Sequence, residues 1–368
     1  MQEVTFTLRT LTPLFLAGAD QTKAEIRAPT FRGLMRYWQR ALVGGLVPDL
    51  DTVKNVEAAV FGATDIGSAV SIRVSAASSE PKEFTEQISV RVGGKWQATG
   101  KGYLLWSMAK SGRVDRGNLK PARWYFPPGT SFQVTISARG TDTTGLEQAS
   151  AAFWLFTHLG GLGSRSRRCA GSLAVQAIEN NITSLPFNAP ENAQAFKLHI
   201  EQGIREAKRI AKPEIVKELA REVAKKRLTS KVAERELAKK VDQFDQRSIR
   251  EAQFDMLAQG VCRIWILQDE QPWPTAEIAM QRLGENLQNY RSHIAIAQRK
   301  IFGLPLPPII FNKRRASPLL LRVAELQGKK YVGIAVLFKT TGSDVSMGDY
   351  KFIEDWVNEF RGKQEVTL

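Results

Sequence analysis

The order of apolar and polar residues predicts a chain built from short strands and helices. Residues 3–12 alternate apolar side chains, among them Val4, Phe6 and Leu8, with polar neighbours, which is typical of a half-buried strand. Comparable patterns predict strands at 69–76, 131–138, 172–178, 261–267, 318–326 and 330–339. Apolar residues at helical spacing predict helices at about 30–43, 56–61, 145–159, 275–300 and 349–361, with Thr30 as the N-cap of the first.

The order of these elements indicates an α+β fold with two related halves. Within residues 1–185 the order is strand–helix–strand, an irregular glycine-rich insertion at about 79–128 that is partly β, and strand–helix–strand again. Two split units of this kind form a ferredoxin-like sheet, the architecture of RNA-recognition modules. Residues 186–368 fit a second copy, so we expect two ferredoxin-like (RRM-like) domains in tandem.

The second half also contains a helical insertion at about 203–258. This segment is rich in Ala, Glu, Lys and Arg, and it places Val216, Leu219 and Val223 at helical spacing. Because acidic and basic residues are mixed along it, a solvated helical insertion is favoured over a dedicated RNA-binding arm.

The net charge of +15 and the pI near 9.9 point to a polyanionic partner. Nucleic acid is favoured over a membrane, because no basic segment has a strong apolar face; a general enrichment in Lys and Arg, as in thermophiles, is the alternative. No apolar run could span a bilayer and the first residues lack a signal-peptide layout, so we expect a cytoplasmic protein. Cys169 and Cys262 lie far apart without a Cys/His cluster, so no disulfide framework, metal or cofactor is expected.

Residues 160–172 (GGLGSRSRRCAGS) form a glycine–arginine loop between a predicted helix and a predicted strand. Glycine lets a backbone approach a ligand closely, and arginine binds phosphate through a planar fork. The loop lacks Gly-Lys-Ser/Thr, and its helix-then-strand order is the reverse of a dinucleotide site. The alternative is a tight turn with its arginines in solvent. The RNA contacts expected here are Gly161, Gly163, Ser164, Arg165, Ser166, Arg167, Arg168 and Gly171.

Other basic residues extend this candidate surface. Arg32, Arg36 and Arg40 share one face of the first helix, Arg27 precedes it, and no acidic residue lies between Arg27 and Arg40. This face is either a track for phosphates or an ordinary solvated surface. The cluster Lys313, Arg314 and Arg315 is a further expected contact, although a solvated turn explains it equally well.

Aromatic and basic residues are interleaved in the irregular insertion. Such a mixture can stack unpaired bases, although aromatic residues more often anchor an insertion to the body of a protein. The aromatic members are Tyr103, Trp106, Trp124, Tyr125 and Phe126, and the basic members are Arg113, Arg116, Lys120 and Arg123.

Support for catalysis is weak. His158, near the glycine–arginine loop, could reach an RNA 2′-hydroxyl, and Asp20 could assist strand cleavage. Each has a plain structural alternative, since a lone histidine can pack in a core and Asp20 can cap a turn or pair with Lys23 or Arg27. We therefore expect no catalytic residues.

Four segments resemble a known family. They are PLFLAGADQTKAEIRAPTFRGLMRYWQRAL, GGLGSRSRRCAGSL, IFGLPLP and RRASPL, in this order along the chain. They closely resemble the RAMP (repeat-associated mysterious protein) superfamily and, within it, the first subunit of the Cmr complex of type III-B CRISPR systems. The resemblance implies two ferredoxin-like domains, binding of guide or target RNA, and assembly with other Cmr subunits in antiviral defence. Cys169-Ala170 stands where the family more often has glycine followed by an aromatic residue.

Three functions remain open from the sequence. The leading one is a non-catalytic RNA-binding subunit of a type III-B effector, in which alanine at Arg165, Arg167 and Arg168 weakens RNA binding without unfolding the protein. The rival is a metal-independent endoribonuclease that processes CRISPR RNA with His158 or Asp20. The third is a scaffold whose basic surface meets acidic partner subunits.

Overall fold

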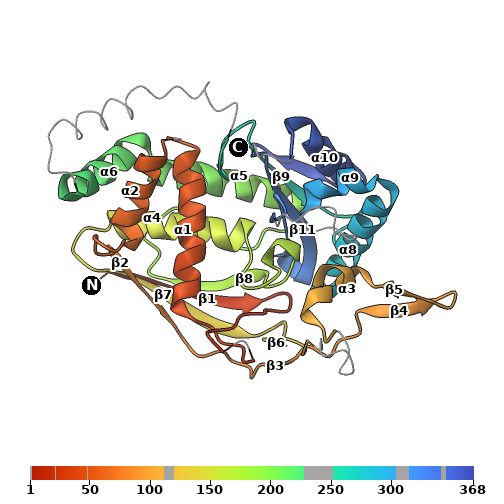
Figure 1. Cartoon of the computed structure of the whole chain (residues 1–368). Helices are drawn as coiled ribbons and strands as arrows, with labels where there is room; N and C mark the ends of the chain where they lie inside the picture. Colours follow the sequence, from red (N-terminus) through yellow and green to blue (C-terminus); the bar gives the residue numbers. More distant parts are fainter. Residues whose placement is uncertain are drawn as a thin grey trace.

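A four-stranded antiparallel sheet organises the N-terminal half of the chain (Figure 1). The computed structural model describes residues 2–20, 22–47, 49–111, 120–227, 252–303, 315–340 and 345–368. The strands are β1 (Glu3–Thr10), β2 (Val70–Val74), β7 (Ser131–Ala138) and β8 (Leu173–Glu179), in the spatial order β2-β7-β1-β8. Each neighbouring pair is antiparallel.

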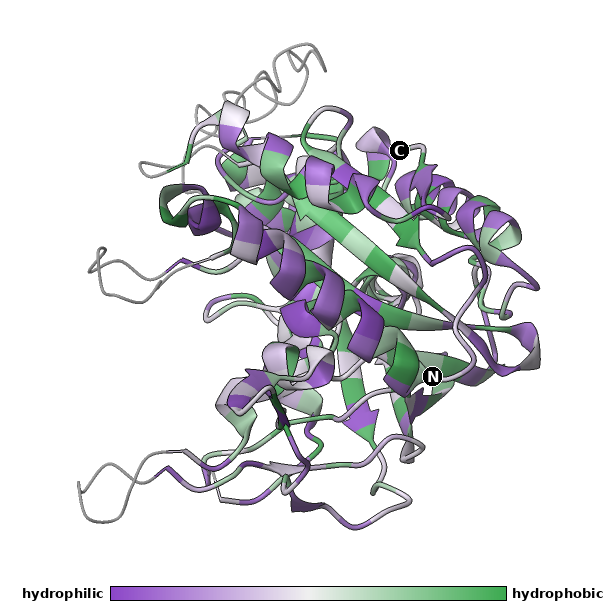
Figure 2. Cartoon of the chain, turned by 90° about the vertical axis from the view of Figure 1, so that its right-hand side faces the viewer, coloured by the Kyte–Doolittle hydropathy of each residue, from purple (hydrophilic) through white to green (hydrophobic). Residues whose placement is uncertain are grey.

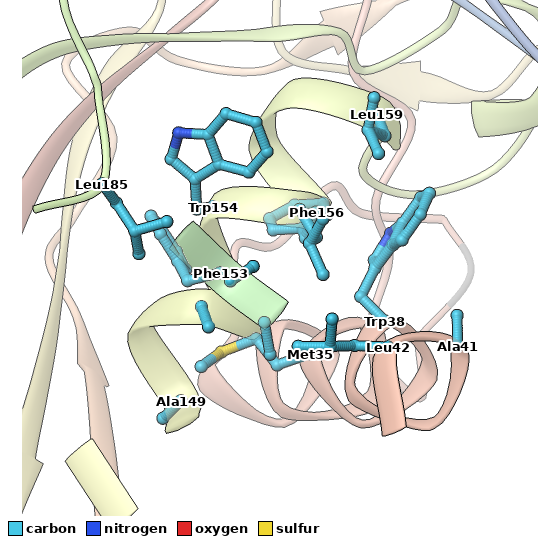
Figure 3. Packing of buried hydrophobic residues seen from close by; sticks show 14 of the residues in the cluster. Met35, Trp38, Ala41, Leu42, Ala149, Phe153, Trp154, Phe156, Leu159 and Leu185 are labelled. Carbon is cyan, nitrogen blue, oxygen red and sulfur yellow. The ribbon is translucent and has the colours of Figure 1, made fainter. Parts of the chain in front are cut away.

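One face of this sheet is buried beneath helices. On β1 the side chains of Val4, Phe6 and Leu8 are fully buried, while the residues between them are half-exposed, as the period of two predicts. The covering helices are α1 (Ala28–Gly44) and α4 (Thr144–Leu159), and α2 (Leu50–Phe61) packs against both of them. Trp38 of α1 and Phe156 of α4 meet in the core between them (Figure 3). Each large apolar side chain buried in this way contributes roughly 1.5–3 kcal/mol.

The first helix begins two residues earlier than the sequence indicates. Arg27, not Thr30, is its N-cap residue, and Pro29 lies in its first turn. Proline is accommodated there because the first N–H groups of a helix have no intrahelical acceptor. The prediction that Thr30 caps this helix is therefore wrong.

The C-terminal half contains a second four-stranded antiparallel sheet. Its strands are β9 (Cys262–Leu267), β10 (Leu319–Leu326), β11 (Lys330–Phe338) and β12 (Gln364–Val366), in the order β10-β11-β9-β12. Numbered within each half, both sheets share the order second–third–first–fourth strand. The helices that follow β9 in the described part of this half are α8 (Ala276–His293), α9 (Ile296–Arg299) and α10 (Lys351–Asn358).

Both faces of the second sheet are buried. Ile264 and Ile334 belong to the core that includes α1 and α4, whereas Trp265 and Leu337 face a second core with Leu283 of α8. This double burial explains the nearly continuous apolar runs of β10 and β11. Figure 2 shows these apolar strands behind helices whose outer turns are largely hydrophilic.

Two helices pack onto the N-terminal half, and the first of them begins ten residues before the predicted helical insertion at about 203–258. They are α5 (Ala193–Ile210), which contacts α4, and α6 (Pro213–Arg227), which contacts α2. Val216 and Val223 of α6 are buried in these contacts. The solvated character expected for this segment is therefore wrong for the inner faces of both helices, because their apolar residues are buried against α4 and α2. Residues 228–251 of the predicted insertion lie outside the described residues.

The irregular insertion is partly β. It contains β3 (Lys82–Glu83), β4 (Ser89–Val92), β5 (Lys95–Ala98), the helix α3 (Gly100–Leu105) and β6 (Trp124–Tyr125). The hairpin of β4 and β5 projects from the body of the molecule, and α3 rests against α8 (Figure 1). None of the helices in the described ranges is long and apolar enough to cross a membrane.

Candidate nucleic-acid interface

The backbone of the glycine–arginine loop is folded against other parts of the chain. Gly171 has φ of +61°, and a Cβ atom at this position would overlap the carbonyl oxygen of Leu162. The N–H of Gly171 donates to Pro13 O, 2.9 Å away, and the N–H of Ser164 donates to Phe15 O, 2.7 Å away. The glycines therefore allow chain segments of the protein itself to pack closely.

The three arginines of the loop donate to backbone carbonyls of distant segments. Arg165 donates through Nε to Leu104 O at 2.8 Å, which fixes the loop to α3. Arg167 donates to Ser317 O at 2.6 Å and Arg168 to Phe302 O at 2.7 Å, which fixes it to the C-terminal half. Each guanidinium is therefore already hydrogen-bonded to a backbone carbonyl before any ligand binds. These bonds form because the loop lies where the insertion and both halves meet.

Burial also affects the charge of the loop. Desolvation, with Arg165 and Arg291 close by, lowers the pKa of Arg168 to about 10. At this pKa the guanidinium keeps its positive charge at neutral pH, and the side chains of Arg165, Arg167 and Arg168 are half-buried. Ser164 is exposed and Gly161 is buried. RNA contact by Gly161, Gly163, Ser164, Arg165, Ser166, Arg167, Arg168 and Gly171 stays a prediction.

The arginines of α1 have partners that the local sequence does not reveal. Glu57 of α2 accepts from both Arg36 and Arg40 at 2.5 Å. Arg32 donates to Phe61 O at 2.8 Å, and the Nε of Arg27 lies 3.9 Å from Glu25 Oε2. The argument that no acid is available to this row is therefore wrong, since tertiary packing supplies one. Phosphate contact by these four arginines stays a prediction.

The third basic cluster is only partly described. Lys313 and Arg314 lie outside the described residues, and the side chain of Arg315 donates to Lys300 O.

The two residues considered for catalysis lie in unlike surroundings. Asp20 is exposed and accepts from the N–H and hydroxyl of Thr22, and these bonds, more than Lys23, hold its pKa below the usual range. His158 is buried, stacked on Trp154 at 4.3 Å, and desolvation holds its pKa well below 6.5. Within the described ranges, no group of three or more His, Cys, Asp or Glu side chains is placed to hold a metal ion.

The open face of the N-terminal sheet offers no aromatic platform. Thr5, Thr7 and Arg9 of β1 lie on this face, and Thr5 is hydrogen-bonded to Thr135 of β7. RNA-recognition modules stack bases on aromatic side chains of their sheet. Binding by that route is unsupported here, because the outward positions of β1, β2 and β7 carry Thr, Ser, Gln and Arg instead of aromatic residues.

The irregular insertion instead presents two of these aromatic side chains to solvent and buries two others. Trp106 is 58% exposed and Trp124 is 42% exposed, whereas Tyr125 and Phe126 are buried. The aromatic residues thus divide between the two interpretations of this segment: the tryptophans are available for stacking and the others anchor the insertion. Arg113 and Arg116 lie outside the described residues.

Trp96 has the most exposed large apolar side chain of the described residues, and the sequence pattern did not single it out. It is 70% exposed on β5, directly opposite Arg91 of β4. Gly93 and Gly94 form the turn between the two strands, and this Gly-Gly pair is a hairpin signal that could have located it. We call Trp96, Trp106 and Trp124 the insertion tryptophans.

Comparisons with known proteins identify the family. The model of the RAMP superfamily matches residues 7–174, from β1 through the glycine–arginine loop. CRISPR system Cmr subunit Cmr1-2 of Pyrococcus furiosus is 31% identical over 191 residues, which cover 48% of this chain and 97% of that protein. The chain belongs to the Cmr1 family of the RAMP superfamily.

Other Cmr1 relatives extend the likeness along the chain. Cmr subunit Cmr1-1 of the same organism is 28% identical over 326 residues, covering 86% of this chain and 81% of that protein. The crystal structure of Cmr1 from Pyrococcus furiosus (apo form) superposes with a TM-score of 0.62 at 20% identity, covering 99% of this chain and 98% of that one. A chain of a type III-B Cmr-beta complex bound to cognate target RNA and AMPPnP superposes with a TM-score of 0.55 at 11% identity, covering 97% and 98%. These two structures share the fold of this chain.

Proposed function

We propose that this chain is a non-catalytic RNA-binding subunit of a type III-B CRISPR effector that contacts guide or target single-stranded RNA in antiviral defence. The observation that carries the proposal is the 31% identity to a Cmr subunit over nearly the whole length of that subunit. The net charge of +15 agrees with a nucleic-acid partner. The protein works in the cytoplasm with the other Cmr subunits.

The irregular insertion is the surface we assign to RNA. Residues 79–128 hold nine lysine and arginine residues against four acidic ones. The insertion tryptophans add exposed aromatic surface to this local positive charge. Stacking on tryptophan together with attraction of phosphates is how proteins bind single strands without reading their sequence, and a guide-directed complex leaves sequence reading to base pairing.

The shared strand order supports two ferredoxin-like domains in tandem. In each half the first strand lies between the third and the fourth, and the second lies at the edge next to the third. Strand–helix–strand units that interlock in this way build the ferredoxin-like sheet. The domains are residues 1–185 and 186–368.

A binding experiment with labelled single-stranded RNA tests the function. Affinity of the purified protein should fall linearly on a log–log plot against salt, because each neutralised phosphate releases counterions. RNA should be recovered intact. Absence of binding both in the isolated protein and in the assembled effector would contradict the proposal.

The same incubation with repeat RNA tests the endoribonuclease. Cleavage by the wild-type protein that disappears in His158→Ala would favour that rival. Burial keeps His158 away from a scissile phosphate, and the exposed Asp20 already accepts hydrogen bonds from Thr22, so we expect no cleavage.

A further inference from the structure

A groove of about 750 Å³ lies between the β4–β5 hairpin and α8. One wall carries Val90 and Gln97, which are paired across the hairpin, and the other carries successive turns of α8 (Figure 1). Because neighbouring residues on a strand point to opposite faces, Arg91 and Trp96 lie on the other side of the hairpin. The hairpin thus separates the groove from Arg91 and Trp96, the part of the proposed RNA surface that lies on its other face.

Close packing at the base of the hairpin fixes the shape of the groove. The helix α3 follows β5 directly and crosses α8, where Gly100 and Gly284 allow the two backbones to touch. Lys101 beside this contact pairs with Glu277 of α8 at 3.0 Å. The groove is therefore present before any partner binds.

The chemistry of the groove does not suit a phosphodiester. Arg282 is the single basic residue among the described lining residues, and it is paired with Asp269 at 3.2 Å and Glu285 at 3.7 Å. The lining is thus slightly acidic in a chain whose net charge is +15. A strand of RNA would be repelled here, and a neutral or singly basic partner would not.

Amide side chains dominate the rest of the lining. They are Gln97, Gln281, Asn286, Gln288 and Asn289. Gln281 is engaged within the protein, since its Oε1 accepts from the N–H of Lys101 and its Nε2 donates to Glu285. An amide side chain carries both N–H donors and a carbonyl acceptor, which match the main chain of an extended peptide. The Oδ1 atom of Asn286 is buried and accepts no hydrogen bond within the described chain, so one polar atom of the lining is left without a donor there.

We propose that this amide groove binds an extended, neutral to singly basic peptide segment of another subunit of the complex. The identity of the partner as a neighbouring subunit rests on the proposed function. The hairpin then has two roles on its two faces: Trp96 faces RNA, and Gln97, the next residue, faces protein.

Photo-crosslinking at these two neighbouring positions tests the inference in the assembled complex. With p-benzoylphenylalanine at Gln97 we expect a crosslink to one peptide of another subunit, and at Trp96 a crosslink to RNA. A crosslink from position 97 to RNA, or none to protein, would overturn the groove assignment. If complex assembly and the RNA crosslink from position 96 persist, the proposed function stands regardless.

Filling the groove gives a second readout. Asn289→Trp should weaken assembly of the chain into the complex at least about tenfold while leaving its affinity for free RNA unchanged. Ile278→Trp, on α8 outside the groove, is the matched control. Equal assembly of the two variants would contradict the inference.

Discussion

Arg322 on β10 is buried and has no carboxylate partner within the described chain. Its guanidinium donates to Thr157 O at the end of α4 and to Leu173 O at 2.7 Å at the start of β8. Desolvation lowers its pKa to about 9. A cation at the C-terminal end of a helix is favourable, so this residue joins the two halves by satisfying carbonyls that would otherwise be unpaired.

Arg322→Met should lower the free energy of unfolding by about 2–4 kcal/mol, because it leaves two buried carbonyls without donors. Urea denaturation measures the change. In Arg322→Lys the charge remains, but one ammonium group cannot reproduce the planar fork, so most of the loss should persist. Full stability in the lysine variant would show that charge alone is sufficient.

Gly171 tests the close packing of the glycine–arginine loop. Gly171→Ala should destabilise the protein by more than the roughly 1–3 kcal/mol of a left-handed backbone, since its Cβ also overlaps Leu162 O. Gly93→Ala is matched, with φ of +55° and open space around it. A similar loss in both variants, measured by thermal unfolding, would exclude the steric contribution.

The histidines of the core predict a pH dependence. Desolvation lowers the pKa of His158 and brings that of His199 to about 4. Between pH 4 and 6.5 the unfolded chain therefore binds more protons than the folded one, and stability falls as pH falls, by up to roughly 1.4 kcal/mol per pH unit for each histidine. Urea midpoints at pH 7 and pH 5 measure this slope. The slope of stability against pH should become shallower in His199→Gln. An unchanged slope in this variant would contradict the assignment of the pH dependence to the buried histidines.

At the scale of elements, one part of the insertion is packed against the body of the protein and another part forms the proposed binding surface. Buried Tyr125 and Phe126 fasten it to the body, and α3 lies against α8. Because this base is fixed, the projecting hairpin presents Trp96 and Arg91 without the entropy cost of ordering a loose loop.

Removing the insertion tryptophans should weaken RNA binding. Each stacked base contributes about 1–3 kcal/mol, so Trp96→Ala, Trp106→Ala and Trp124→Ala should each weaken binding about fivefold or more. Fluorescence anisotropy with labelled single-stranded RNA measures the effect. Leu198→Ala, on α5 and 53% exposed, controls for loss of apolar surface elsewhere. If all three tryptophan variants bind like this control, the insertion is not the RNA surface.

At the scale of the whole molecule, the glycine–arginine loop is the place where three parts of the chain meet. Its arginines bond to α3 and to two segments of the C-terminal half, and the N–H of Cys169 donates to Leu321 O of β10 at 2.9 Å. The buried Cys169 and Ala170 belong to the same core as α8 and α10. The loop therefore sets how the two halves are placed.

Alanine at Arg165, Arg167 and Arg168 together should destabilise the protein by several kcal/mol, at about 1.5–3 kcal/mol for each lost charged hydrogen bond. Alanine at Lys95, Lys110 and Lys120, exposed residues of the insertion, removes the same charge and should change stability by less than about 0.5 kcal/mol. That lysine variant should nevertheless weaken RNA binding and flatten its salt dependence. If instead the triple arginine variant is stable and the triple lysine variant is unstable, the loop is better interpreted as an open phosphate site.

The sequence by itself determined the elements, because alternation and helical spacing record which side of each element is buried. The strand predicted at 131–138 matches β7, and the helix predicted at 145–159 matches α4 to within a residue. Only the tertiary structure decided what the charged residues do. Glu57 is distant in sequence from Arg36 and Arg40, and the acceptors of Arg165, Arg167 and Arg168 are backbone carbonyls, which no residue pattern reveals. Local periodicity reports burial, whereas the partner of a guanidinium depends on which segments folding brings together.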